Sequence, residues 1–111
     1  DGVESAAWLE MALYRRGRCI VFLVEGDSMR PTLANGDKVL IRRTRSIKVD
    51  DLVLTRHPYM SDVNIIKRVS SISDDGRFTL LGDNPSESTD SRTFGTVSIE
   101  SIIGNVVSRL K

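Results

Sequence analysis

The sequence has few of the residues that mark disulfide-stapled, metal-binding or membrane-spanning proteins. Among its 111 residues, Cys19 is the only cysteine and His57 the only histidine, so an intrachain disulfide is impossible and no Cys/His spacing suggests a metal site. The longest uninterrupted apolar run, residues 19–24, falls far short of the roughly 20 residues that a membrane-spanning helix needs. We therefore predict a reduced protein that needs no metal or other cofactor.

The two signs of charge are nearly balanced, with 16 lysines and arginines against 15 aspartates and glutamates. A net charge of +1 gives no support for a nucleic-acid binder, which would show a basic excess. Hydrophobic residues make up 40% and charged residues 28%, proportions typical of a globular domain. We predict a cytoplasmic protein. Because the chain begins at Asp1 and not at methionine, the alternative is a membrane-associated protein whose upstream anchor has been removed.

The chain divides into a short helical segment and a longer β region. Residues 5–14 combine good helix formers with a serine suited to an N-cap, and Gly17 suits the end of a helix. Beyond Gly17, short apolar runs alternate with turn residues, which favours β-structure. We predict a mainly β fold in one domain, with an N-terminal helix in residues 1–17 and the β region in residues 18–111. The predicted strands are 19–24, 38–43, 52–56, 64–71, 77–81 and 105–108.

Residues 64–71, NIIKRVSS, place a lysine in the middle of an apolar face. In an extended strand the side chains of Ile65, Lys67 and Val69 lie on one side of the chain. One interpretation is that Lys67 lays its stem along the core and keeps its ammonium in water. The other is a desolvated lysine with a lowered pKa, which can act as a base near neutral pH. The strand alone leaves both interpretations open.

Two connections are rich in hydroxyl groups on which a lysine base can act. Residues 25–33 contain turn residues together with Met29 and Leu33, and residues 82–95 make a connection of fourteen residues, long for a compact β-domain. Long ordered connections often carry function. A serine hydroxyl becomes a good nucleophile when a neighbouring base takes its proton, and a neutral lysine can be that base. Composition does not choose among the serines.

Four motifs occur in an order that resembles the type I signal peptidase family. Residues 26–33 read GDSMRPTL, residues 35–39 read NGDKV, residues 66–69 read IKRV, and residues 82–95 read GDNPSESTDSRTFG. They are similar to the nucleophile, Gly-Asp-x-Val, Lys-Arg-Val and Gly-Asp-Asn motifs of that family. The resemblance covers roughly residues 24–108. It implies a signal peptidase- and LexA-like catalytic β-fold with a short N-terminal helix.

Within that family, the chain is most similar to the small nickel-type superoxide dismutase maturation proteases. The similar features are the compact chain, the sequence RHPY at 56–59 before the lysine strand, and the run NPSESTDSR at 84–92. Some members of the wider family carry a larger β-domain inserted after the lysine motif. Residues 70–81 leave room only for a hairpin at that place, so the resemblance implies a catalytic core alone.

The resemblance implies a role for each matching residue. Ser28 matches the nucleophile, Lys67 the general base, and Ser88 the hydroxyl that orients the lysine amine. The backbone N–H of Ser28 matches one oxyanion donor. Gly26 stands where some branches have a Ser or Thr hydroxyl as the second donor. Glycine cannot supply a hydroxyl, so the resemblance leaves a backbone group or a water for that contact.

Asp90 and Arg92 match an ion pair that supports the site without taking part in the chemistry. The implied activity is that of a serine endopeptidase with a Ser-Lys dyad, which removes an N-terminal leader from an extended peptide. The branch resemblance predicts the precursor of a nickel superoxide dismutase as the substrate. An extended leader would pair with a strand edge, as added strands do in other peptide-binding proteins.

Three alternative functions are compared with the sequence. A general type I signal peptidase would cut secretory leaders at a membrane surface, where a helix at 5–14 would rest peripherally on lipid. A self-cleaving repressor of the related fold would need a DNA-binding domain and an internal Ala-Gly or Cys-Gly bond, and the sequence has neither. A non-catalytic peptide-binding module would leave its ligand intact and would not depend on Lys67.

Overall fold

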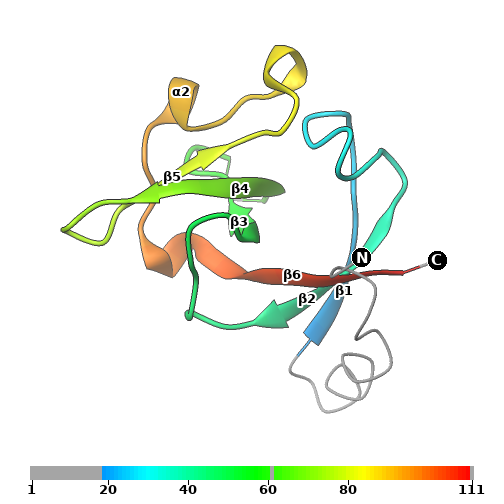
Figure 1. The fold of residues 1–111 in the computed structure, drawn as a ribbon, viewed down its shortest axis with the longest axis horizontal. Coiled ribbons are helices and arrows are strands. Elements are labelled where there is room, and N and C mark those ends of the chain that lie inside the picture. Colours follow the sequence, from blue (N-terminus) through cyan, green and yellow to red (C-terminus); the bar gives the residue numbers. More distant parts are fainter. Residues whose placement is uncertain (1–18, 61, 111) are drawn as a thin grey trace.

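The computed structural model describes residues 19–60 and 62–110, which form one antiparallel sheet with short helical turns at its rim (Figure 1). The strand order is β1-β2-β6-β3-β4-β5. The predicted mainly β fold is confirmed. The strands are β1 (Cys19–Leu23), β2 (Lys38–Arg43), β3 (Leu52–Arg56), β4 (Asn64–Ile72), β5 (Phe78–Leu81) and β6 (Ile102–Leu110). The helical turns are η1 (Pro85–Glu87), α2 (Ser91–Phe94) and η2 (Ile99–Ser101).

Each face of the sheet carries its own hydrophobic cluster. Strand β3 shows the alternation, because Leu52 and Leu54 belong to the first cluster and Val53 to the second. The first cluster also contains Val24, Met29, Leu33, Val39, Ile41 and Ile66. The second also contains Val69, Phe78, Leu80, Phe94, Val97 and Ile102.

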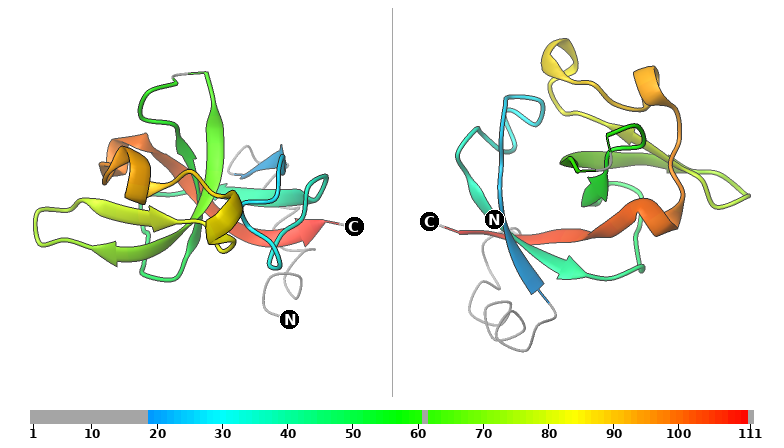
Figure 2. Two further views of the ribbon diagram at one scale, coloured as in Figure 1. Left: turned by 90° about the horizontal axis from the view of Figure 1, so that it is seen from above. Right: turned by 180° about the vertical axis from the view of Figure 1, so that it is seen from behind.

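The connections after β1 and after β5 lie side by side at one end of the sheet (Figure 2). The backbone joins them directly, since the N–H of Asn84 donates to the carbonyl of Ser28 over 2.8 Å. Met29 and Leu33 explain how the first connection is fixed, because both side chains are inserted into the first cluster. The fold therefore brings together the two hydroxyl-rich segments that residues 34–81 separate in the sequence.

Most strand predictions are confirmed, and the largest difference is in the last strand. Strands β2 and β3 have the predicted bounds, whereas β6 begins three residues earlier than predicted and ends two residues later. Gly104 concealed the start of β6, because glycine is a weak strand former. The structure gives it a packing reason: a side chain there would collide with the backbone of Arg42 on β2.

The apolar face predicted for β4 accounts for only one side of the strand. Val69 is buried in the second cluster and Ile65 packs against it, as expected for that face. Ile66, on the opposite side of the strand, is buried in the first cluster. Strand β4 therefore packs against both clusters.

The connection at 82–95 is more regular than an open loop. It contains η1 and α2, and the carboxylate of Asp90 caps α2 by accepting the N–H of Arg92 over 3.1 Å. The helix predicted within residues 1–17 lies outside the described residues, so the division of the chain near residue 17 stays a prediction. No helix of residues 19–60 and 62–110 is long and apolar enough to cross a bilayer.

Candidate active site

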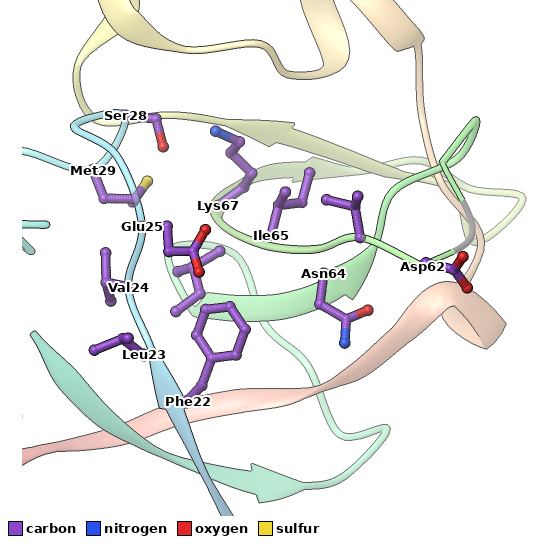
Figure 3. A pocket seen from close by; sticks show the side chains of 12 residues that line it. Phe22, Leu23, Val24, Glu25, Ser28, Met29, Asp62, Asn64, Ile65 and Lys67 are labelled. Atoms are coloured by element: carbon purple, nitrogen blue, oxygen red, sulfur yellow. The ribbon is translucent and has the colours of Figure 1, made fainter. Parts of the chain in front are cut away.

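A pocket of about 440 Å³ opens between the end of β1 and the start of β4 (Figure 3). Ser28 and Lys67 both line it, and their hydroxyl and amine lie at the same end. The rest of the lining is largely apolar, with Phe22, Leu23, Val24, Met29, Ile65 and Ile66 among its residues. The pocket therefore holds the predicted nucleophile and base together in a partly desolvated setting.

Lys67 is buried on β4, with 3% of its surface exposed. This burial excludes the interpretation in which the tip of Lys67 extends into bulk water. Burial lowers the pKa of Lys67 below that of an ordinary lysine, although the Asp90 carboxylate opposes this effect, and the charge of Arg92 lowers it further. A neutral amine is thereby favoured, and a neutral amine has a lone pair that can accept a proton.

Ser88 connects the lysine amine to a buried carboxylate. The Nζ of Lys67 lies 3.1 Å from the Oγ of Ser88, and this hydroxyl donates to Oδ2 of Asp90 over 3.0 Å. Because the hydroxyl proton points to Asp90, Ser88 accepts an N–H from Lys67. A neutral amine that donates to Ser88 keeps its lone pair for another partner in the pocket.

Asp90 is the most heavily bonded group of the site, and 1% of its surface is exposed. The guanidinium of Arg92 donates two hydrogen bonds to its carboxylate, over 2.6 and 3.0 Å, and the N–H of Gly82 donates to it over 2.8 Å. Burial would raise the pKa of Asp90, but the hydrogen bonds from Arg92, Gly82 and Ser88 outweigh it and hold that pKa well below the ordinary range. Asp90 is therefore ionised and fixed, as acceptors of several donors are.

Gly82 permits the close approach of the two connections. A Cβ atom at this position would lie within 3 Å of the Ser88 hydroxyl and of the Ser28 carbonyl oxygen. Both are backbone or short side-chain groups that cannot swing away. The absence of a side chain at Gly82 therefore allows the Ser88 side chain and the Ser28 backbone to pack closely around it.

Ser28 sits in the connection after β1 and is half-buried. Its carbonyl accepts the N–H of Asn84, and the side-chain amide of Asn84 donates to the carbonyl of Asp27 over 3.0 Å. Within the described part of the chain, the N–H of Ser28 donates to no acceptor. That N–H is therefore available to a substrate, and its role as an oxyanion donor stays a prediction.

The second oxyanion contact, which the resemblance leaves to a backbone group or a water near Gly26, stays a prediction. Gly26 has no hydroxyl, and its N–H donates to Oδ1 of Asn35 over 2.7 Å, so this N–H is engaged within its own loop. Gly26, with φ of 82°, turns the chain from β1 into the Ser28 segment.

One supporting network was not assigned from sequence. Arg68 binds both carboxylate oxygens of Asp83 over 2.9 and 2.8 Å, and Asp83 accepts the hydroxyl of Thr32 over 2.5 Å. These three residues tie β4 and the 82–95 connection to the segment that carries Ser28. All three belong to the quoted motifs, so the motifs were the available signal, but their mutual contacts depend on the fold.

His57 does not line the pocket, and the described residues contain no cluster of metal ligands. His57 packs edge-on against Phe94, with ring centroids 5.3 Å apart, and it is not among the residues that line the pocket. Within residues 19–60 and 62–110, no three His, Cys, Asp or Glu side chains gather in a way that could hold a metal ion. The chemistry available at this end of the pocket is that of a hydroxyl, an amine and a backbone donor.

Comparison with known proteins identifies relatives that cover most of the chain. A family model described as Peptidase S24-like matches residues 2–107. Mitochondrial inner membrane protease subunit 1 of Xenopus tropicalis is 32% identical over 113 residues, which cover 81% of this chain and 68% of the relative. The protein of the same name from Schizosaccharomyces pombe is 31% identical over 113 residues, covering 81% and 72%. The chain therefore belongs to the Peptidase S24-like family, a group of proteases of the signal peptidase and LexA type.

Proposed function

We propose that this protein is a serine endopeptidase of the signal peptidase type, in which Ser28 is the nucleophile and Lys67 the general base. The observation that carries the proposal is the buried Lys67, bonded to Ser88 and lining the same pocket as Ser28. A desolvated amine is the form that can take a proton near neutral pH. The family and the protease relatives support the same reaction class.

In the proposed reaction, the Oγ of Ser28 attacks the scissile carbonyl carbon while the Nζ of Lys67 takes the hydroxyl proton. The N–H of Ser28 donates to the resulting oxyanion. The C–N bond then breaks as the Lys67 ammonium returns the proton to the leaving amine, which leaves an acyl ester on Ser28. A water that Lys67 deprotonates then attacks the ester carbonyl, the bond from the acyl carbon to the Ser28 Oγ breaks, and the Lys67 ammonium returns the proton to this Oγ as the leader is released.

The substrate is proposed to bind as an added strand between β1 and β4. Among the described residues, Phe22 and Leu23 pair only with β2, and residues 64–67 pair only with β3. Backbone groups therefore remain unpaired on both sides of the pocket. An extended peptide that pairs with them would pass directly over Ser28 and Lys67.

We propose a precursor with an N-terminal leader as the substrate class, and the comparisons favour a general processing peptidase. The narrower substrate predicted from sequence, a nickel superoxide dismutase precursor, rests on the branch resemblance alone. The cytoplasmic location predicted from sequence likewise stays a prediction, and the alternative is action at a membrane surface. Fractionation of cells that express the full-length protein separates these two locations.

The activity is tested by incubating the purified protein with two precursors, one with an Ala-x-Ala secretory leader and one of a nickel superoxide dismutase. The product N-termini are then sequenced. We expect a single cut in the secretory precursor by the wild type and none by Ser28→Ala, while circular dichroism shows the same fold. Cleavage of the dismutase precursor alone would instead support the prediction that a nickel superoxide dismutase precursor is the substrate. Equal cleavage by wild type and Ser28→Ala would overturn the proposed dyad.

A further inference from the structure

The pocket contains an acidic side chain that the proposed chemistry does not use. Glu25 follows β1 and lines the pocket with Ser28 and Lys67. Its carboxylate points from the β1 side across the pocket toward β4 (Figure 3). Most of the surrounding lining is apolar, so this carboxylate is a distinctive feature of the wall.

The Glu25 carboxylate has no protein partner in the described part of the chain. No hydrogen bond or ion pair involves its side chain, and the residue is exposed to solvent in the open pocket. An extended peptide that fills the pocket would displace the water around it. A carboxylate that loses water without gaining a partner is unfavourable, whereas a cationic partner compensates for the lost hydration.

The charge of the pocket also favours a cation. Among the described residues of the lining, Glu25 and Asp62 are acidic and Lys67 is basic, so acidic side chains are in excess. The whole chain has a net charge of +1, so this acidic pocket differs in sign from the molecule as a whole. A local field of this kind attracts cationic groups and repels anionic ones.

We propose, on the basis of the proposed function, that Glu25 selects precursors with a lysine or arginine within about four residues of the scissile bond. An extended peptide advances about 3.3 Å per residue, so only residues close to the scissile bond pass Glu25. Glu25 lies three residues before Ser28 and shares its pocket, so its reach is limited to this part of the substrate. Asp62 lies at the end of the pocket away from Ser28. Glu25 is therefore the specificity-determining carboxylate next to the reacting bond.

A charge-scanned peptide series tests this proposal. Lysine, norleucine or glutamate is placed in turn at each of four positions on either side of the bond in a fluorogenic leader peptide. At one position we expect wild type to prefer lysine over norleucine by about tenfold in kcat/KM, a difference typical of a paired charge at an interface. Glu25→Gln should reduce this preference to about twofold or less, and Glu25→Lys should reverse it in favour of glutamate.

A matched variant shows whether the effect belongs to Glu25. Glu100→Gln removes an exposed acidic charge outside this pocket. It is expected to keep the lysine preference. Equal cleavage of the lysine, norleucine and glutamate peptides by wild type, or an unchanged preference in Glu25→Gln, would overturn the proposal.

A binding measurement separates this inference from the proposed function. The same peptides, carrying a fluorophore, are titrated against Ser28→Ala, which keeps the pocket and cannot form the acyl ester. Tighter binding of the lysine peptide, lost when Glu25→Gln is added, supports the role of Glu25 even where wild type cuts nothing. Cleavage without any charge preference in binding or turnover contradicts Glu25 alone and leaves the protease assignment intact.

Discussion

Lys67 and Ser28 lie at the same end of one pocket, but the structure holds them by different means. Lys67 is buried in a strand, and hydrogen bonds connect its amine through Ser88 to the fixed carboxylate of Asp90. Ser28 is half-buried in a connection, and its position depends on backbone and amide contacts with Asn84. Side-chain hydrogen bonds therefore hold the base, whereas hydrogen bonds from Asn84 to backbone carbonyls hold the segment that carries the nucleophile.

The difference follows from what each residue has to do. A lysine must lose its proton to act as a base, so its environment has to shift its pKa, and burial in a strand is an effective way to do so. A serine hydroxyl is neutral in any environment and needs only correct placement beside the base. Variants on the base side should therefore affect chemistry more than variants on the nucleophile backbone.

The largest effect is expected for Lys67→Met. Removal of the base should lower kcat/KM by about 10³-fold or more, because Lys67 is the only basic side chain among the described residues that line the pocket. The matched control is Lys48→Met, which alters an exposed lysine outside the pocket. Peptide hydrolysis within tenfold of wild type by Lys67→Met would show that the buried amine is not the base.

The same substitution should stabilise the fold near neutral pH. Methionine has a similar length and carries no desolvated amine, so the free energy of unfolding is expected to rise by about 1 kcal/mol. Because its pKa is lowered, Lys67 binds fewer protons in the native state than in the unfolded state as the pH approaches the ordinary value of 10.5 from below. Wild-type stability therefore rises with pH through that window, and the advantage of Lys67→Met should shrink from pH 7 to pH 10 in urea denaturation.

A smaller effect is expected for Ser88→Ala. The amine keeps its burial but loses the acceptor that orients it, so kcat should fall by about 10²-fold with little change in KM. Ser86→Ala is the matched control, because that hydroxyl contacts only the Asn84 side chain in the same connection. A rise in KM with unchanged kcat would show that Ser88 binds the substrate and does not orient the base.

The smallest effect is expected for Asn84→Ala. This change removes the amide donation to Asp27 but keeps the backbone N–H that holds the Ser28 carbonyl. Loss of one hydrogen bond should reduce kcat/KM by about threefold to tenfold and stability by about 1 kcal/mol. A loss of activity as large as that of Ser88→Ala would show that catalysis depends as strongly on the position of the Ser28 backbone as on the hydrogen bonds around Lys67.

The sequence predicted the strands better than the connections, for a physical reason. Strands β2 and β3 are short apolar runs between turn residues, so local pattern defines their bounds. The helical turn α2 was missed because it is short and depends on capping by Asp90. Likewise, the burial of Ile66 depends on a second cluster that packs over β4, which no local pattern reports.

The site was predicted unevenly for the same reason. The motifs named Ser28, Lys67 and Ser88, and the fold brings all three to one end of the structure. The motifs gave no sign that the Gly26 N–H is engaged by Asn35, since that contact is made between side chain and backbone within a turn. Contacts of this kind follow from the path of the chain, and the path is set by packing across the whole sheet.

The most direct test of the central claim, a neutral Lys67 beside Ser28, is a titration of the lysine Cε carbons by NMR. The chain has four lysines, so the spectrum is simple, and the spectrum of Lys67→Met assigns the resonance of interest. We expect the titration midpoint of Lys67 to lie clearly below the ordinary lysine value of 10.5, because burial lowers its pKa. A midpoint for Lys67 at or above that ordinary value would contradict its role as a base near neutral pH.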